Sequence, residues 1–104
     1  MKTKFEPYYA VIFTSTQGEQ IEGYSEMAEK MELIAKEQDG FIGIDSARND
    51  VGITVSYWQD LDSIKKWKQN SEHLIAQRKG RSQWYNWYNV RICKIKKEYE
   101  YSSP

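Results

Sequence analysis

The stretch from Phe41 to Trp58 reads Phe-Ile-Gly-Ile-Asp-Ser-Ala-Arg-Asn-Asp-Val-Gly-Ile-Thr-Val-Ser-Tyr-Trp. Residues 41–48 and 53–58 are rich in β-branched and aromatic residues, which is typical of strands. Residues 49–52, between them, are of types that tolerate the positive φ angles of a tight turn. The stretch therefore predicts a β-hairpin in the middle of the chain. One face of its second strand carries Ile53, Val55 and Tyr57, and the other carries Thr54, Ser56 and Trp58.

Amphipathic helices are predicted on both sides of this hairpin. Before it, apolar residues recur at three- and four-residue steps from Tyr24 to Ala35, with charged residues between them. Asp39-Gly40 ends this helix. After the hairpin, Asp60 or Asp62 caps a second helix, and Gly80 ends it. The inner stripe of the second helix is predicted to contain Leu61, Ile64, Trp67, Ser71, Leu74, Ile75 and Arg78.

Two outer strands complete the chain. Residues 8–15 are almost continuously apolar and predict a first strand. Residues 88–101 predict a long last strand, preceded by an aromatic segment that forms a short helical turn. The order β-α-β-β-α-β is that of the ferredoxin-like α+β fold, in which two helices cover one face of an antiparallel four-stranded sheet.

Apolar residues occur on both faces of the predicted strands, and two helices cannot cover them all. The second face then needs a partner layer, and a symmetric homodimer packed sheet against sheet supplies it most simply. The long last strand would reach across the partner. The residues concerned are Val11, Ile12, Phe13, Phe41, Ile42, Ile44, Val55, Trp58, Ile92 and Ile95.

Length and composition limit the functional classes. The 104 residues fit a single domain, 1–104, with an ordered core over about 8–101. Fifteen basic residues balance fifteen acidic ones, so no global charge favours nucleic acid or an anionic membrane. The single Cys93 cannot form an intrachain disulfide, and no targeting or membrane-spanning stretch is present in this sequence. We therefore expect a cytoplasmic protein that binds neither nucleic acid nor membrane.

All four tryptophans and the single histidine lie between Trp58 and Tyr88. Such aromatic residues either close a core or interface, or line a pocket for a flat ligand. His73 is six residues from Trp67, about 120° around a regular helix, so it is either a proton-transfer group at a pocket rim or a structural histidine. Arg81 either binds an acidic or phenolate oxygen or forms a salt bridge. One histidine and one cysteine are too few for a zinc site, so no metal is expected.

The chain resembles antibiotic biosynthesis monooxygenase (ABM) domains from about Tyr8 to Tyr101. The resemblance is carried by the element order, by Asp39-Gly40-Phe41-Ile42-Gly43, and by the progression from Tyr57-Trp58 through Leu61-x-x-Ile64-x-x-Trp67 to His73. Gly80-Arg81-x-x-Trp84-Tyr85-x-x-Tyr88 is similar to a segment of small bacterial ABM-like proteins. The resemblance implies a dimeric α/β barrel.

The family includes cofactor-free oxygenases of aromatic polyketides, heme-degrading proteins and members without known activity. Trp67 matches a tryptophan of the heme-degrading members, but Thr14 and Ser15 replace their strand-one asparagine, and Gln77 stands where their heme-ligating histidine lies. Heme is therefore the disfavoured alternative. The resemblance implies a cofactor-independent monooxygenase for a small aromatic substrate; the alternatives are a non-catalytic or heme-binding dimer and a structural dimer. The expected catalytic residues are His73 and Arg81, and the expected substrate-binding residues are Trp58, Trp67, Trp84, Phe13 and Met31.

Overall fold

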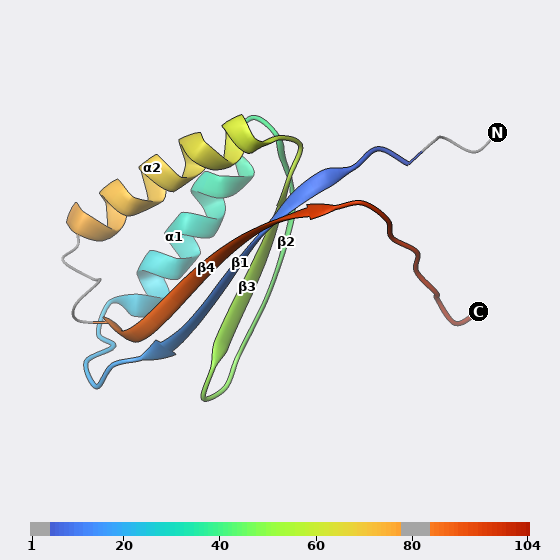
Figure 1. Ribbon diagram of the computed structural model, residues 1–104. Helices are drawn as coiled ribbons and strands as arrows, with labels where there is room; N and C mark the ends of the chain where they lie inside the picture. Colours follow the sequence, from blue (N-terminus) through green and yellow to red (C-terminus); the bar gives the residue numbers. More distant parts are fainter. Residues whose placement is uncertain (1–4, 78–83) are drawn as a thin grey trace.

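The computed structural model describes residues 5–77 and 84–104, with the backbone alone for 73–77. The chain forms six elements, and their β-α-β-β-α-β order confirms the prediction (Figure 1). They are β1 (Tyr8–Gln17), α1 (Tyr24–Lys36), β2 (Phe41–Arg48), β3 (Gly52–Trp58), α2 (Leu61–Gln77) and β4 (Tyr85–Ile95).

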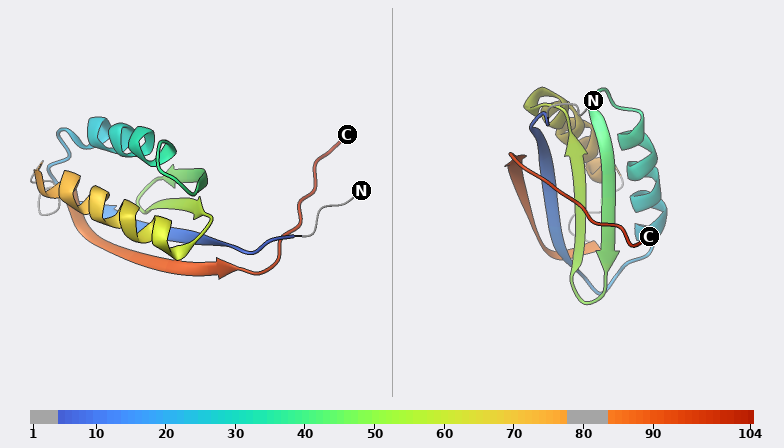
Figure 2. Two further views of the ribbon diagram at one scale, coloured as in Figure 1. Left: turned by 90° about the horizontal axis from the view of Figure 1, so that it is seen from above. Right: turned by 90° about the vertical axis from the view of Figure 1, so that its right-hand side faces the viewer.

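The four strands make one antiparallel sheet in the order β2-β3-β1-β4. Both helices lie on the same face of this sheet, which leaves the other face uncovered in the monomer (Figure 2). The fold is therefore the ferredoxin-like α+β arrangement. We call the two sides of the sheet the helix face and the open face.

The core lies between the helices and one end of the sheet, around Trp58. The Trp58 side chain is 0% exposed and clusters with Ala35 and Ile64. Its ring packs edge-on against Phe41, with centroids 5.5 Å apart, and stacks with Trp67 at 6.1 Å. Its indole N–H donates a 2.9 Å hydrogen bond to Ser56 Oγ, so the polar tip is satisfied inside the core.

Local chemistry fixes the turn into β2 and the start of α2, whereas α1 ends at Lys36 with Glu37 as its C-cap, before the expected Asp39-Gly40. Gly40 has a φ of 84°, and a Cβ at this position would collide with the Ser63 side chain, so the turn into β2 requires glycine. Asp60 Oδ1 accepts a 2.8 Å hydrogen bond from the Ser63 backbone N–H. Of the two predicted caps, Asp60 is therefore the one that bonds to the first turn of α2.

Two expectations need correction. The last strand covers Tyr85–Ile95 rather than 88–101, because Ile95 pairs with Tyr8 at the start of β1 and none of the described strands lies beside the later residues. The segment beyond it extends away from the sheet, and Tyr99 is 90% exposed (Figure 1). Leu61, expected in the inner stripe of α2, is 53% exposed, because the first residue of the helix lies outside the packed region.

Candidate functional site

A cavity of about 410 Å³ lies between the helix face of the sheet and the two helices. All six elements contribute to its wall. Apolar and aromatic surface predominates, which is typical of sites for flat organic ligands. The large side chains in the wall are Phe13, Tyr24, Met27, Met31, Trp67, Tyr85 and Tyr88.

Small side chains in the sheet create this space. Ser56 of β3 pairs with Ile44 and Val11, and Thr54 pairs with Ser46 and Phe13, so both rows belong to the helix face. On β2 and β3 these rows carry serines and a threonine where larger apolar residues would otherwise fill the gap beneath α1. The sequence therefore builds a cavity next to the dense Trp58 core rather than one continuous core.

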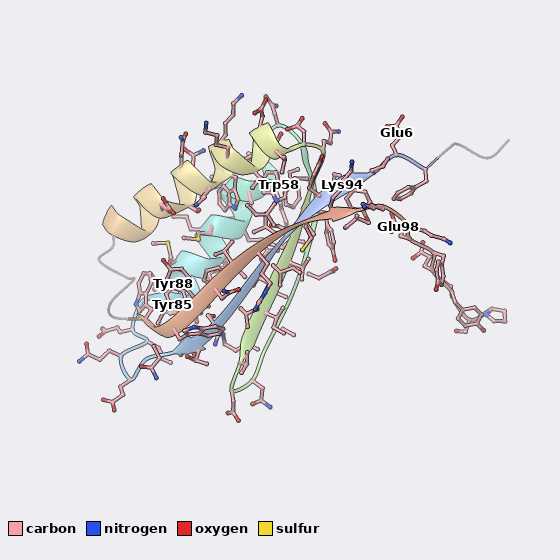
Figure 3. The ribbon with its side chains drawn as sticks, in the orientation of Figure 1. Glu6, Trp58, Tyr85, Tyr88, Lys94 and Glu98 are labelled. Carbon is pink, nitrogen blue, oxygen red and sulfur yellow. The ribbon has the colours of Figure 1, made fainter. Side chains whose placement is uncertain are left out.

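Aromatic rings surround the end of the cavity farthest from Trp58 (Figure 3). Tyr88 stacks on Phe13 with centroids 5.3 Å apart, and Tyr85 meets Phe13 edge-on at 5.5 Å. Tyr85 and Tyr88 share the helix face although they are three positions apart, which in a regular strand would place them on opposite faces. The register between β1 and β4 shifts at Thr16/Gln17, which absorbs one residue of β4 and turns Tyr85 toward the cavity.

A cation and two phenols lie together at this aromatic end. The Arg48 guanidinium donates hydrogen bonds to Ser15 Oγ and, at 3.3 Å, to Tyr24 Oη. It also lies 5.5 Å from the centroid of the Tyr24 ring. Burial raises the pKa of the Tyr85 phenol well above its ordinary value, and the neighbouring Tyr24 phenol raises it further. Tyr85 is therefore a neutral hydrogen-bond donor at physiological pH.

The raised pKa predicts a specific alkaline behaviour. A phenol whose pKa is higher in the folded state than in the unfolded state stabilises the fold below the unfolded value, near 10, and loses that contribution as the pH rises further. We expect Tyr85→Phe to remove one late-ionising phenol from a spectrophotometric titration. The free energy of unfolding of this variant should also fall less steeply above about pH 10 than that of the wild type. Loss of a phenol that ionises near its ordinary pKa, rather than of a late-ionising one, would contradict the burial of Tyr85.

Trp84 supports this end of the cavity from behind. Its ring is buried and meets Tyr24 edge-on, with centroids 6.1 Å apart. Its indole N–H donates a 2.8 Å hydrogen bond to the backbone carbonyl of Glu22. Trp84 thereby ties the start of β4 to the loop before α1 and holds Tyr24 in place.

The structure brings some of the expected site residues together. Phe13, Met31 and Trp67 line the cavity. Trp58 and Trp84, expected to contact substrate, are buried in packing, and the cavity wall does not include them. His73 lies on α2, where only the backbone is described, and Arg81 lies outside the described residues.

Arg48, Tyr24 and Tyr85 were not among the expected site residues. Arg48 stands at the end of a predicted strand with no motif around it, so local sequence gives little reason to select it. Tyr85 could not be assigned to a face by alternation because of the register shift in β4. Gly52 was the feature of the sequence that could have indicated Arg48. It pairs with Arg48 across the hairpin, and it has no side chain that would block the arginine.

Residues 5–77 and 84–104 contain no group of three or more metal-binding side chains placed to hold an ion. In the same part of the chain no helix is both long enough and apolar enough to cross a membrane.

Comparisons with known proteins give one family match and one similar curated protein. The sequence model of the family described as antibiotic biosynthesis monooxygenase matches residues 7–79. The uncharacterised protein YqjZ of Bacillus subtilis (strain 168) is 48% identical over 99 residues, which cover 93% of this chain and 87% of that protein.

Solved structures give the same fold. SnoaB from Streptomyces nogalater, described as a cofactor-independent oxygenase, superposes with a TM-score of 0.71 at 10% identity, over 88% of this chain and 95% of that one. PA3566 from Pseudomonas aeruginosa superposes with a TM-score of 0.68 at 16% identity, over 93% of this chain and 100% of that one. At such identities the likeness shows the shared fold alone.

Proposed function

This chain belongs to the antibiotic biosynthesis monooxygenase family, and from that premise we propose that it is a cofactor-independent monooxygenase of a small, flat aromatic molecule. The observation that carries the proposal is the 410 Å³ cavity walled by aromatic and methionine side chains. The cofactor-independent oxygenase SnoaB has the same fold, which supports the proposal of an oxygenase. Phe13, Met31 and Trp67 are the proposed substrate contacts; Trp58 stacks against Trp67, and Trp84 packs against Tyr24 of the cavity wall.

Such a reaction needs an electron-rich substrate and no external reductant. Deprotonation gives an aromatic anion that transfers an electron to O₂, and the resulting radicals combine. A hydroquinone, for example, reacts with one O₂ to give a hydroxyquinone and one water. Atoms and electrons therefore balance between the hydroquinone and O₂. The protein would supply a desolvated cavity and a group that accepts the proton.

The groups proposed for proton transfer and anion binding are His73 and Arg81. His73 titrates near neutral pH when unperturbed, and its position about 120° around α2 from Trp67 suits the rim of the cavity rather than its wall. We expect His73→Ala to lower turnover by about 10² to 10⁴, the usual contribution of a general acid or base. Unchanged turnover in a folded variant would remove His73 from the mechanism.

The activity is tested by oxygen incorporation. A panel of hydroquinones is incubated with the protein under isotopically labelled dioxygen, and mass spectrometry measures the label in the product. One labelled oxygen per product without added flavin or metal, above the buffer blank, is the expected result. Hydrogen peroxide with unlabelled quinone would indicate simple autoxidation and contradict the proposal.

A cavity-filling substitution tests where the chemistry takes place. Ala28 lies on α1 in the cavity wall, so Ala28→Phe places a ring in the space that the substrate would occupy. We expect binding of aromatic ligands and turnover to fall at least tenfold while the fold is kept. The matched control is Leu33→Phe, on the same helix but 59% exposed and outside the wall, which should change neither. Equal effects of the two variants would contradict a site in this cavity.

The proposal extends to partners and location. We propose a homodimer packed through the open face and a cytoplasmic setting, with no nucleic acid or membrane as partner. A non-catalytic or heme-binding role is the competing hypothesis. A shift of the heme Soret band on mixing with the protein would favour it, and its absence is what we expect.

A further inference from the structure

Arg48 is an exposed cation beside the apolar cavity: it lies outside the wall itself but donates a hydrogen bond to Tyr24, which belongs to the wall. It belongs to the cross-strand row Arg48, Gly52, Ser15 and Tyr88, which lies next to the cavity row Ser46, Thr54, Phe13 and Val90. The guanidinium crosses over Gly52, since a Cβ there would collide with its Cζ and with two of its three nitrogens, Nη2 and Nε. The sequence therefore removes a side chain at position 52 so that Arg48 can reach Ser15 and Tyr24.

The charge on Arg48 has no internal counter-ion. Among the residues that the structure describes, which include every aspartate and glutamate of the chain, no carboxylate forms a salt bridge with it. Its two described side-chain bonds go to neutral hydroxyls, and both use the same nitrogen, Nη2. A guanidinium carries five N–H donors in a planar fork, so donors on its other nitrogens are available to a ligand.

We propose that Arg48 and the Tyr24 phenol form an oxyanion subsite at the aromatic end of the cavity. The ligand class is a planar aromatic molecule that carries a conjugated oxyanion, either a carboxylate or a phenolate. Its ring would lie against Phe13, Tyr85 and Tyr88, and its oxygen would point to Arg48. This inference deepens the proposed function, because it rests on the cavity being the ligand site.

The surroundings of the subsite favour a bound anion. Ser15 is fully buried beneath Arg48 and holds Nη2 in place, so the guanidinium is oriented before a ligand arrives. Tyr85, whose pKa is raised, stays a neutral phenol and adds no negative charge near the oxyanion. Bidentate pairing with a guanidinium also fixes the direction of a carboxylate in a way that a lysine could not.

Matched neutral and anionic ligands test the subsite without relying on turnover. Isothermal titration calorimetry compares naphthoate with its uncharged isostere naphthamide on the whole protein. We expect wild-type protein to bind naphthoate about 10- to 100-fold more tightly, as suits a charge-assisted hydrogen bond. Arg48→Gln should remove this preference and leave naphthamide binding within about twofold. Arg48→Lys should keep part of the preference for naphthoate.

Gly52→Ala supplies an independent test, because it displaces the guanidinium without changing its charge. It should abolish the preference as Arg48→Gln does. The matched control is Gly43→Ala, also in the β2–β3 hairpin, where the new Cβ would make an ordinary 3.8 Å contact with Tyr57 on the open face. This control should keep the full preference.

A phenolate probe distinguishes the two oxygen classes. Bound nitrophenol should ionise at lower pH in the wild type than in Arg48→Gln, as followed by its phenolate absorbance. Preference for either anion supports the subsite and identifies its oxygen class. Equal binding of charged and neutral probes, or a loss of naphthamide binding in Arg48→Gln, would overturn it. Binding of naphthoate without oxygen consumption would contradict the oxygenase alone, whereas no binding of any probe would contradict both proposals.

Discussion

Replacing Trp58 with alanine is expected to lower the free energy of unfolding of this chain by about 3–5 kcal/mol. Trp58 is 0% exposed and joins Ala35 and Ile64 of the two helices to Phe41 of the sheet. Removing a buried tryptophan ring typically costs about 3–5 kcal/mol, because apolar burial is lost and a cavity remains. A domain of this size has only about 5–15 kcal/mol of total stability. The single substitution therefore removes a large part of it.

Denaturant unfolding measured by circular dichroism checks this result. Trp58→Phe keeps most of the ring volume and loses the bond to Ser56, so its midpoint should lie between those of the wild type and Trp58→Ala. Leu61→Ala is the control for an apolar residue that lies mostly in solvent, and its effect should stay within about 0.5 kcal/mol. A wild-type midpoint for Trp58→Ala would show that the core is assembled elsewhere.

The fold was predictable from sequence because each element carries its own periodicity. The three- and four-residue steps of α1 are a local pattern that corresponds to its observed burial. The alternation of β3 is also local and separates its two faces, but the buried side is that of Ser56 and Trp58, and the more apolar side lies on the open face. The end of the last strand could not be predicted from a local pattern. Ile95 is the last paired residue because β1 begins at Tyr8, and this depends on the register between two strands distant in sequence.

The candidate site was only partly predictable for the same reason. Phe13, Met31 and Trp67 could be selected because they lie on the inward faces of regular elements. Arg48 reaches the cavity border by crossing a neighbouring strand, and Tyr85 turns inward through a register shift. Neither placement follows from alternation within one strand. The small residues Ser46, Thr54 and Ser56, which create the space, are readily interpreted as ordinary polar strand residues.

The open face of the sheet is too apolar to be exposed without a partner. Ile53 and Trp87 on this face are 46% and 50% exposed in the monomer, and Ile12 and Val55 lie beside them. A face of this kind is ordinarily buried against a second layer. The second copy of the chain that we propose above would supply this layer, because an isologous interface needs no other partner.

Charges at the two edges of this face select the arrangement of the copies. The row Asp45, Val55, Ile12 and Arg91 carries an anion on β2 and a cation on β4, with apolar residues between them. A two-fold axis parallel to the strands places β2 of one protomer over β4 of its partner, so Asp45 meets the partner's Arg91. An axis perpendicular to the strands would set like charges against each other, which costs several kcal/mol.

Charge reversal at either position is therefore expected to break the dimer. Asp45→Arg and Arg91→Asp each create like-charge pairs twice per dimer by symmetry, so the dissociation constant should rise about a hundredfold or more. Sedimentation velocity at micromolar protein measures the loss. Lys66→Asp, an equal charge change on the outer side of α2, is the control and should leave the dimer intact.

Mixing the two charge-reversed proteins is the decisive experiment. In a heterodimer of Asp45→Arg with Arg91→Asp, every edge pair again joins opposite charges, so an equimolar mixture should recover the dimer that neither variant forms alone. Dissociation of the single variants and recovery on mixing together require that positions 45 and 91 face each other across the interface, as the parallel axis places them. Single variants that remain dimeric would place the interface elsewhere or turn the axis perpendicular to the strands, where each reversal only replaces one like-charge pair by another. Dissociated variants that stay dissociated on mixing would reject the parallel axis, because only that axis brings the two substituted positions together.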